Sequence, residues 1–190
     1  MYPLFIQHCL FSADKCSKNQ FLRSLLSKCC FPSPLKRSSI LERYTTTAST
    51  AKRLRCNYLK FSIPPKAKEV HFKTMNEIYP CKELLCLKFN ADVNECTFCE
   101  NNIETQEHLF FSCNVSDRFW KVLYQWLLEN NLSLSPLSDE NIQFGVALED
   151  KKTEFLLNSI MILAKHYIHK CKFMSVTPYF QVMLKELAIF

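Results

Sequence analysis

The chain has 190 residues, of which 48% are hydrophobic, and it carries a formal net charge of +6. This size and composition suffice for one globular domain with a buried core. No apolar run reaches the roughly 18 to 20 residues that a membrane-spanning helix needs, so we expect no contact with a membrane. The apolar beginning, MYPLFIQHCLF, lacks a preceding basic region and a following cleavage site of small residues, which argues against a secretion signal.

The eleven cysteines raise the question of disulfide bonds. Their number is odd, the chain is larger than most disulfide-stabilised miniproteins, and no export signal is recognisable. We therefore expect a reducing compartment, either the nucleus or the cytoplasm.

Charge is divided unevenly along the chain. Residues 1–68 contain 13 Lys and Arg residues against two acids, a net charge of +11, whereas residues 69–190 contain 11 against 16, a net charge of −5. The composition before Arg55, rich in Ser, Thr, Lys and Arg, buries little apolar surface. We predict a flexible basic arm over residues 1–52 and a helical domain over residues 53–190.

The first part of that domain shows helical patterns. Pro64 and Pro65 mark a helix start, and apolar residues recur at helical spacing up to Pro80. The segment CKELLCLKF predicts a second, short helix. Further along, Ser116 or Asp117 is expected to cap a third helix. The apolar face of that helix comprises Phe119, Val122, Leu123, Trp126 and Leu127.

The remainder continues in the same way. NNLSLSPLSDE is typical of a loop, and NIQFGVAL predicts a short strand or an extended connection. A long helix is expected from about Thr153 to Cys171, and a last helix is expected to begin near Pro178. The sequence therefore predicts a mainly α-helical domain.

The segment NECTFCENNIETQEHLFFSC contains the most specific pattern in the chain. Cys96, Cys99, His108 and Cys113 follow the spacing C-x2-C-x8-H-x4-C. Two cysteines separated by two residues can direct both sulfurs to one point, and a His and a Cys can complete a tetrahedron of ligands that zinc prefers. We predict one zinc ion at this CCHC site. The alternative is a coincidence of three buried thiols and a core histidine.

A site with four protein ligands leaves no coordination position for water or a substrate, so we expect the zinc to be structural. Glu107, beside His108, is then a surface residue or a partner that orients a ligand. Asn101 and Asn102 suit the left-handed turn that this loop needs where glycine is absent. No phosphate-binding glycine loop and no nucleophile with its base is recognisable, so we expect no enzymatic activity and no small-molecule substrate.

Taken together, the segments FSIPPKAKEVHFKTMNEIYP, CTFCENNIETQEHLFFSC, FWKVLYQWL and ILAKHYIHKCKF closely resemble a known family. It is the zinc-binding segment that follows the polymerase in reverse transcriptases of LINE-type, non-LTR retrotransposons. The resemblance covers roughly residues 53–190. It implies that the four Cys and His residues bind zinc, and that Phe119 and Trp120 lock the zinc turn onto the next helix. Nothing in the chain resembles the paired catalytic aspartates of the polymerase or an endonuclease.

The resemblance also implies weak, largely sequence-independent contact with RNA or DNA, because the family's segment is thought to help its polymerase engage nucleic acid. Two basic regions offer cations for phosphate. The expected contacts are Lys52, Arg53, Arg55, Lys60, Lys66 and Lys68 in the first region and Lys165, Lys170 and Lys172 in the second. For both regions, an ordinary solvated surface is the alternative.

A protein-interaction module is the main alternative function, with zinc stabilising a scaffold that binds a reverse transcriptase supplied in trans. A non-functional retroelement relic is a further alternative. Salt distinguishes the first two functions, because phosphate contacts weaken steeply as salt rises whereas apolar contacts persist.

Overall fold

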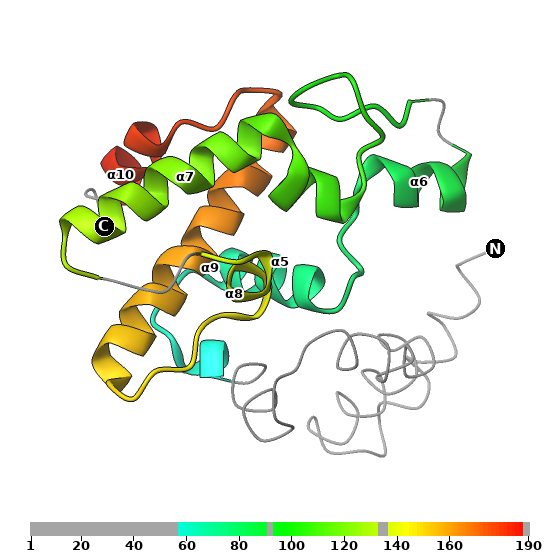
Figure 1. Cartoon of the computed structure of the whole chain (residues 1–190). Helices are drawn as coiled ribbons and strands as arrows, with labels where there is room; N and C mark the ends of the chain where they lie inside the picture. The colour runs from blue at the N-terminus through cyan, green and yellow to red at the C-terminus, as the bar shows by residue number, and fades with distance from the viewer. Residues whose placement is uncertain (1–56, 91–92, 133–136, 188–190) are drawn as a thin grey trace, which may run out of the picture. The chain divides into compact units, whose positions relative to one another are not determined.

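The computed structural model describes residues 57–90, 93–132 and 137–187, and these belong to one compact unit, Thr46–Phe190 (Figure 1). The predicted basic arm, residues 1–52, lies outside the described residues, so its boundary and its flexibility stay predictions. Among the described residues no helix is long and apolar enough to cross a membrane.

The fold is mainly helical, as the sequence predicts. The described elements are η2 (Tyr58–Lys60), α5 (Pro65–Met75), α6 (Lys82–Phe89), η3 (His108–Ser112), α7 (Asn114–Glu129), α8 (Asp139–Phe144), α9 (Lys151–Met174) and α10 (Phe180–Leu187). In the described part of the chain, extended pairing is limited to one isolated antiparallel bridge between Glu95 and Ile103.

Most helix boundaries follow from local chemistry. Pro65 occupies the first turn of α5, where its missing N–H costs nothing, and the helix ends at Met75. This end lies earlier than the predicted one because Glu77 adopts a left-handed backbone with φ of 54°. At the start of α9 the Asp150 carboxylate accepts hydrogen bonds from the backbone N–H groups of Lys152 and Thr153.

Two sequence predictions are wrong. Helix α7 begins at Asn114, so Ser116 does not cap it; its hydroxyl instead donates to the Leu109 carbonyl at 2.6 Å. Residues 139–144, predicted as part of a loop and of a strand or extended connection, form α8 because the Ser138 hydroxyl accepts from the Asn141 N–H. A single cap thus outweighs the short apolar run that suggested a strand.

Gly145, the only glycine in the chain, ends α8 with φ of 94°. A Cβ atom at this position would lie 2.5 Å from Oδ1 of Asn158. That amide accepts from Val146 N–H at 2.7 Å and donates to Val146 O at 2.9 Å. The glycine therefore lets Asn158 fasten the connection after α8 to helix α9.

The main apolar core gathers residues from η3, α7, α9 and α10. Phe119 of α7 stacks on Tyr167 of α9, with ring centroids 5.8 Å apart, and meets the edge of Phe180 of α10 at 6.1 Å. Helix α9 lies between this core and α5 (Figure 1). A second cluster, Tyr58, Phe61, Ala67, Met75 and Ile162, fills the α5 side.

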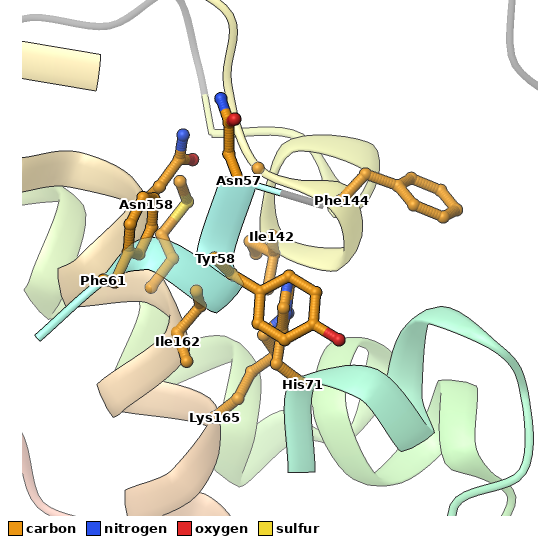
Figure 2. A pocket seen from close by; sticks show the side chains of 11 residues that line it. Asn57, Tyr58, Phe61, His71, Ile142, Phe144, Asn158, Ile162 and Lys165 are labelled. Carbon is orange, nitrogen blue, oxygen red and sulfur yellow. The ribbon is translucent and has the colours of Figure 1, made fainter. Parts of the chain in front are cut away.

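A fully buried lysine lies in the interface between α5 and α9. The Lys165 amine is 2.5 Å from Nδ1 of His71 and donates to the Gln143 carbonyl at 3.1 Å (Figure 2). Burial lowers the pKa of Lys165 well below its ordinary value, and burial together with Lys165 lowers the pKa of His71. The adjoining pocket has a cavity volume of about 10 Å³, which is too small for a metabolite.

This buried amine predicts a pH-dependent stability. The unfolded chain binds a proton at Lys165 below pH 10.5, and the folded chain binds it less readily because the pKa is lowered, so stability rises as the pH approaches that value. Relative to Lys165→Met, the wild-type free energy of unfolding should rise between neutral pH and pH 9.5 by at most about 1.4 kcal/mol per pH unit. Urea unfolding at several pH values measures this.

Lys152→Met, which removes an exposed lysine from the same helix, is the control and should leave the pH dependence unchanged. A constant difference between wild type and Lys165→Met across this range would mean that Lys165 is charged in the folded chain.

Candidate metal centre

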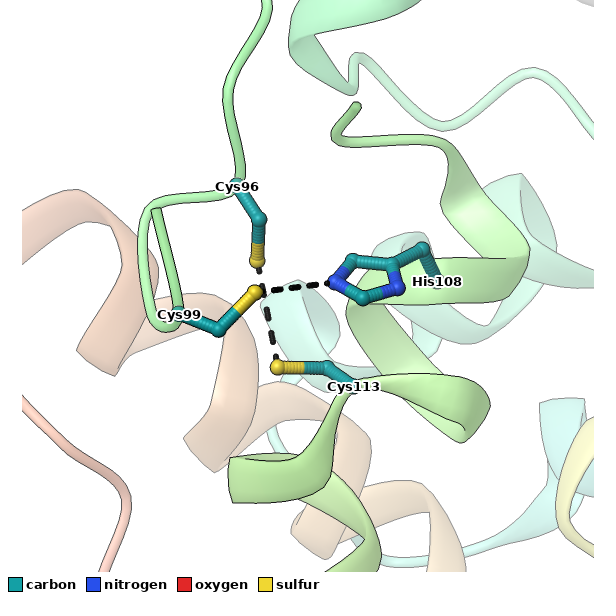
Figure 3. A group of neighbouring side chains, drawn as sticks. All are labelled: Cys96, Cys99, His108 and Cys113. Carbon is teal, nitrogen blue, oxygen red and sulfur yellow. Dashed lines mark hydrogen bonds between the residues drawn. The ribbon is translucent and has the colours of Figure 1, made fainter. Parts of the chain in front are cut away.

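The four predicted ligands converge on one point (Figure 3). The sulfur atoms of Cys96, Cys99 and Cys113 and a ring nitrogen of His108 all lie within 4.8 Å of one another. Cys99 Sγ is 3.2 Å from His108 Nε2, and Cys96 Sγ is 3.9 Å from Cys113 Sγ. Figure 3 shows Cys96 and Cys99 entering from a loop and His108 from helical backbone, and Cys113 is the extended residue between η3 and α7.

The loop half of the centre is a tight turn. Cys96 N–H donates to the Asn102 carbonyl at 2.7 Å, and Glu100 N–H donates to the Cys96 carbonyl at 3.0 Å. The Phe98 N–H lies 3.4 Å from the Cys96 sulfur and points a backbone dipole at it. The left-handed position in this turn belongs to Glu100, with φ of 56°, and not to either of the predicted asparagines.

The helical half depends on a π-helical turn, η3. Cys113 N–H donates to the His108 carbonyl at 2.8 Å, so one i to i+5 hydrogen bond joins the two ligands directly. In an α-helix, residues five apart would point about 140° away from each other. The wider π-helical turn instead lets the side chains of His108 and Cys113 point to the same place. With Nε2 facing the sulfurs, His108 Nδ1 lies 3.5 Å from the Ser112 hydroxyl.

The aromatic pair after the last ligand fixes this turn to α7, as predicted. Phe119 and Trp120 are buried, and Trp120 Nε1 donates to the Phe110 carbonyl in η3 at 2.7 Å. The Thr105 hydroxyl accepts from His108 N–H at 2.8 Å. The histidine ligand is therefore held from both sides of its turn.

The thiols differ in acidity. Burial raises the pKa of Cys96 to about 12 and also raises that of Cys113. At Cys99 burial acts in the same direction, but hydrogen bonds from the Asn101 backbone and from His108 outweigh it and lower the pKa to about 6. Because a divalent cation favours thiolates, metal binding at this cluster releases protons.

The donor set fits zinc. Three thiolates and one imidazole, whose ligand atoms all lie within 4.8 Å of one another, match the tetrahedral structural sites that zinc forms. Such a site has no free position for water, so its role is to hold the loop and η3 together. It contributes folding free energy and not hydrolytic chemistry.

Comparison with known proteins agrees with this geometry. Residues 39–120 match the protein family described as zinc-binding in reverse transcriptase. This segment is similar to the zinc-binding domains of reverse transcriptases. The matched residues include all four ligands and end at Trp120. No curated protein matches the chain, and no solved structure matches it.

The match to the reverse-transcriptase zinc-binding family begins at residue 39, within the predicted arm, and stops before most of α7. Helices α8, α9 and α10 lie beyond it, yet they supply much of the core that supports the metal centre. The domain described by the structure is therefore larger than the matched segment.

The predicted nucleic-acid residues fall into different environments. Lys52, Arg53 and Arg55 lie outside the described residues. Lys60 and Lys66 are exposed, and Lys68 donates to the Leu59 carbonyl at 2.9 Å. On α9, Lys170 is half-exposed and pairs with Glu186 at 2.5 Å.

Two predicted phosphate contacts need correction. Lys165 is completely buried, and the Lys172 amine pairs with the buried carboxylate of Glu104 at 2.8 Å, with its side chain 9% exposed. Neither cation can reach a phosphate in this fold. The sequence could not show this, because both lysines stand beside polar or charged neighbours on a helix that is buried on most sides.

Sequence reasoning also missed two residues. Glu104 is buried beside the metal turn, although in the sequence it resembles its exposed neighbours Glu100 and Glu107. Phe173 is 68% exposed at the end of α9, although an aromatic residue on a long helix is usually expected in the core. No spacing pattern distinguishes either residue from its neighbours.

The metal assignment predicts one tightly bound zinc per chain, measured by elemental analysis of purified protein. Cys96→Ser/Cys99→Ser should lose the zinc and should unfold at a lower temperature, because the loop then has no link to η3. His108→Ala should behave in the same way. Cys86→Ser is the control, because Cys86 lies outside the four-ligand cluster. A folded parent without zinc would identify the chain as a relic whose metal site has decayed.

Proposed function

We propose that this reverse-transcriptase zinc-binding domain is a non-catalytic accessory module that binds RNA or DNA and derives from a LINE-type retrotransposon. The closed four-ligand centre supports a structural and not a chemical role for the metal. The resemblance of the segments around the ligands and along α9 supports the LINE-type origin.

One observation carries the nucleic-acid proposal, which is the gathering of three lysines and two histidines on one face of α5 and α9. We define this basic face as Lys66, Lys73, His166, His169 and Lys170. Burial and the positive charges around it lower the pKa of His169 to about 4, and burial with Lys170 and Lys66 lowers the pKa of His166. The contribution of Lys66 to both shifts places its amine near these imidazoles, so the three lysines form one group that a phosphate backbone would be attracted to.

Carboxylates moderate the attraction. Glu69 pairs with Lys66 at 3.0 Å and with Lys73 at 2.6 Å, which lowers its pKa to about 2, and Glu186 pairs with Lys170. A bound phosphate must compete with these acids for the same amines. We therefore expect weak binding that depends on several simultaneous contacts.

An aromatic row beside the cations suits single-stranded nucleic acid. The rings of His166 and His169 stack with centroids 6.2 Å apart, and the edge of Phe173 meets His169 at 4.7 Å. Phe173 is the most exposed of the three, so one of its faces is open to an unpaired base. Stacking tolerates any base, which agrees with sequence-independent contact.

The proposal predicts a specific salt response. Lys66→Ala/Lys73→Ala/Lys170→Ala should weaken binding of a short single-stranded RNA or DNA and should reduce the slope of log K against log salt by about 2. Fluorescence anisotropy across a salt series measures both quantities. Phe173→Ala should raise Kd about tenfold without changing the slope.

Lys121→Ala/Lys152→Ala/Lys185→Ala is the matched control, because it removes the same charge from exposed positions elsewhere. Equal weakening by both triple variants would reduce the effect to net charge and would contradict a defined face.

The basic arm supplies a separate prediction. Charge reversal at Lys52, Arg53 and Arg55 should weaken RNA or DNA binding, because it replaces three attractive contacts by three repulsive ones. Circular dichroism should remain that of the parent, since none of the described helices contains these residues. Binding equal to that of the parent would remove the arm from the interaction.

A protein-interaction module is the second candidate, and α6 is the observation that favours it. This helix buries none of its residues, and Leu87 and Phe89 are 76% and 72% exposed. Val93 and Ile103, elsewhere in the segment between α6 and η3, are also exposed, at 58% and 51%. A reverse transcriptase supplied in trans is the partner to test, and binding that persists at high salt would favour this function.

A further inference from the structure

The buried carboxylate of Glu104 touches three separate parts of the chain. Its Oε2 accepts from the Thr97 N–H at 3.0 Å and from the Thr97 hydroxyl at 2.6 Å. Its Oε1 accepts from the Lys82 N–H at 3.0 Å and pairs with Lys172 Nζ at 2.8 Å. One side chain thus joins the turn between Cys96 and Cys99, the first residue of α6 and the far end of α9.

From these contacts we propose that Glu104, held by Lys172, is the positioning residue for the Cys96–Cys99 half of the metal centre, so that α9 controls the affinity of the site for zinc. This inference concerns the metal site alone and does not depend on nucleic-acid binding.

The two halves of the centre differ in how they are supported. His108 and Cys113 are held by η3, by α7 and by the Trp120 hydrogen bond to the Phe110 carbonyl. The loop half is not helical; Phe98 packs against the main core, and Cys99 itself is only partly buried. Thr97, which lies between the two loop ligands, is fixed by two hydrogen bonds to Glu104. The carboxylate therefore sets the direction from which both sulfurs approach the metal.

Lys172 keeps this carboxylate in place. Its amine also donates to the Pro80 carbonyl at 2.8 Å and lies 5.0 Å from the centre of the Tyr79 ring. Glu104 is 0% exposed, so removal of its cation would leave an uncompensated charge in the interior. The carboxylate would then move toward water and release Thr97.

If the loop is not already ordered, zinc binding must order it. The entropy lost in this ordering lowers the measured affinity for zinc. Groups that orient metal ligands without touching the metal typically change affinity by about 10- to 100-fold. By linkage, zinc binding should in turn stabilise the packing of the α9 end that carries Lys172.

The test is zinc affinity of the full chain, measured by competition with a chromophoric chelator. Glu104→Gln and Lys172→Met should each weaken zinc binding by about 10- to 100-fold. The double variant should be weaker by less than the product of the two effects, because both changes break one interaction. Cobalt(II) absorption at saturation should still show thiolate ligation, since all four ligands remain.

Two controls match these changes. Glu107→Gln removes an exposed carboxylate beside His108, and Lys170→Met removes a lysine two residues from Lys172. Both should bind zinc as the parent does. Equal weakening by these variants would mean that overall charge near the site, and not Glu104, sets the affinity.

Thr97→Val separates positioning from folding, because it removes one hydrogen bond and leaves the buried ion pair intact. We expect about tenfold weaker zinc binding and little change in the unfolding temperature of the zinc-free protein. Unchanged zinc affinity in Thr97→Val would overturn the proposal. So would equal loss of thermal stability with and without zinc in Glu104→Gln, which is the result of a purely structural ion pair.

Discussion

The requirement to cover the buried faces of helix α9, including its polar residues, organises this chain. Eleven of its 24 residues are buried, and they include the polar residues Glu154, Asn158, Ser159 and Lys165. Glu154, Asn158 and Lys165 each bond to a residue outside α9, and the Ser159 hydroxyl donates to the Phe155 carbonyl within it, as buried polar groups must where water is absent. Helix α5 covers one side of α9 and the core under α7 and α10 covers the other. Helix α8 and the connection after it supply partners for most of these buried polar groups of α9.

The metal centre stabilises a segment of the domain that has almost no secondary structure of its own. The segment from Glu95 to Thr105 contains no helix and only one bridge pair, so hydrogen bonds alone give it little rigidity. Three sulfurs and one imidazole replace the missing apolar core with bonds to a cation. The hydrogen bond from Trp120 to η3 and the ion pair between Lys172 and Glu104 then connect this loop to the helices.

Sequence alone identifies what depends on short-range spacing. The four ligands lie within eighteen residues of one another, and the zinc preference for Cys and His is independent of the rest of the fold, so their pattern could be recognised. The helices with clear periodicity were likewise predictable. The match of residues 39–120 to reverse-transcriptase zinc-binding domains agrees with the predicted zinc site, whereas the arm boundary at residue 52 and the nucleic-acid contacts stay predictions.

What escaped prediction depends on long-range contacts. Lys165, Lys170 and Lys172 share one short basic segment, yet their environments differ. Lys165 is buried against His71, Lys170 is half-exposed and pairs with Glu186, and Lys172 pairs with Glu104. These partners of Lys165 and Lys172 lie 60 to 95 residues away in the chain. Likewise, α8 exists because one serine caps it, a signal weaker than the apolar run that suggested a strand.

The scarcity of glycine has an energetic consequence. Left-handed backbone at Glu77, Asn90, Glu100, Asn131 and Ser175 is occupied by residues with a Cβ, which costs about 1–2 kcal/mol at each position. In exchange, the unfolded chain has fewer accessible conformations than a glycine-rich one, so less entropy is lost on folding. The connections between helices are therefore stiff but strained, and their strain is balanced by the helices and the metal centre that they join.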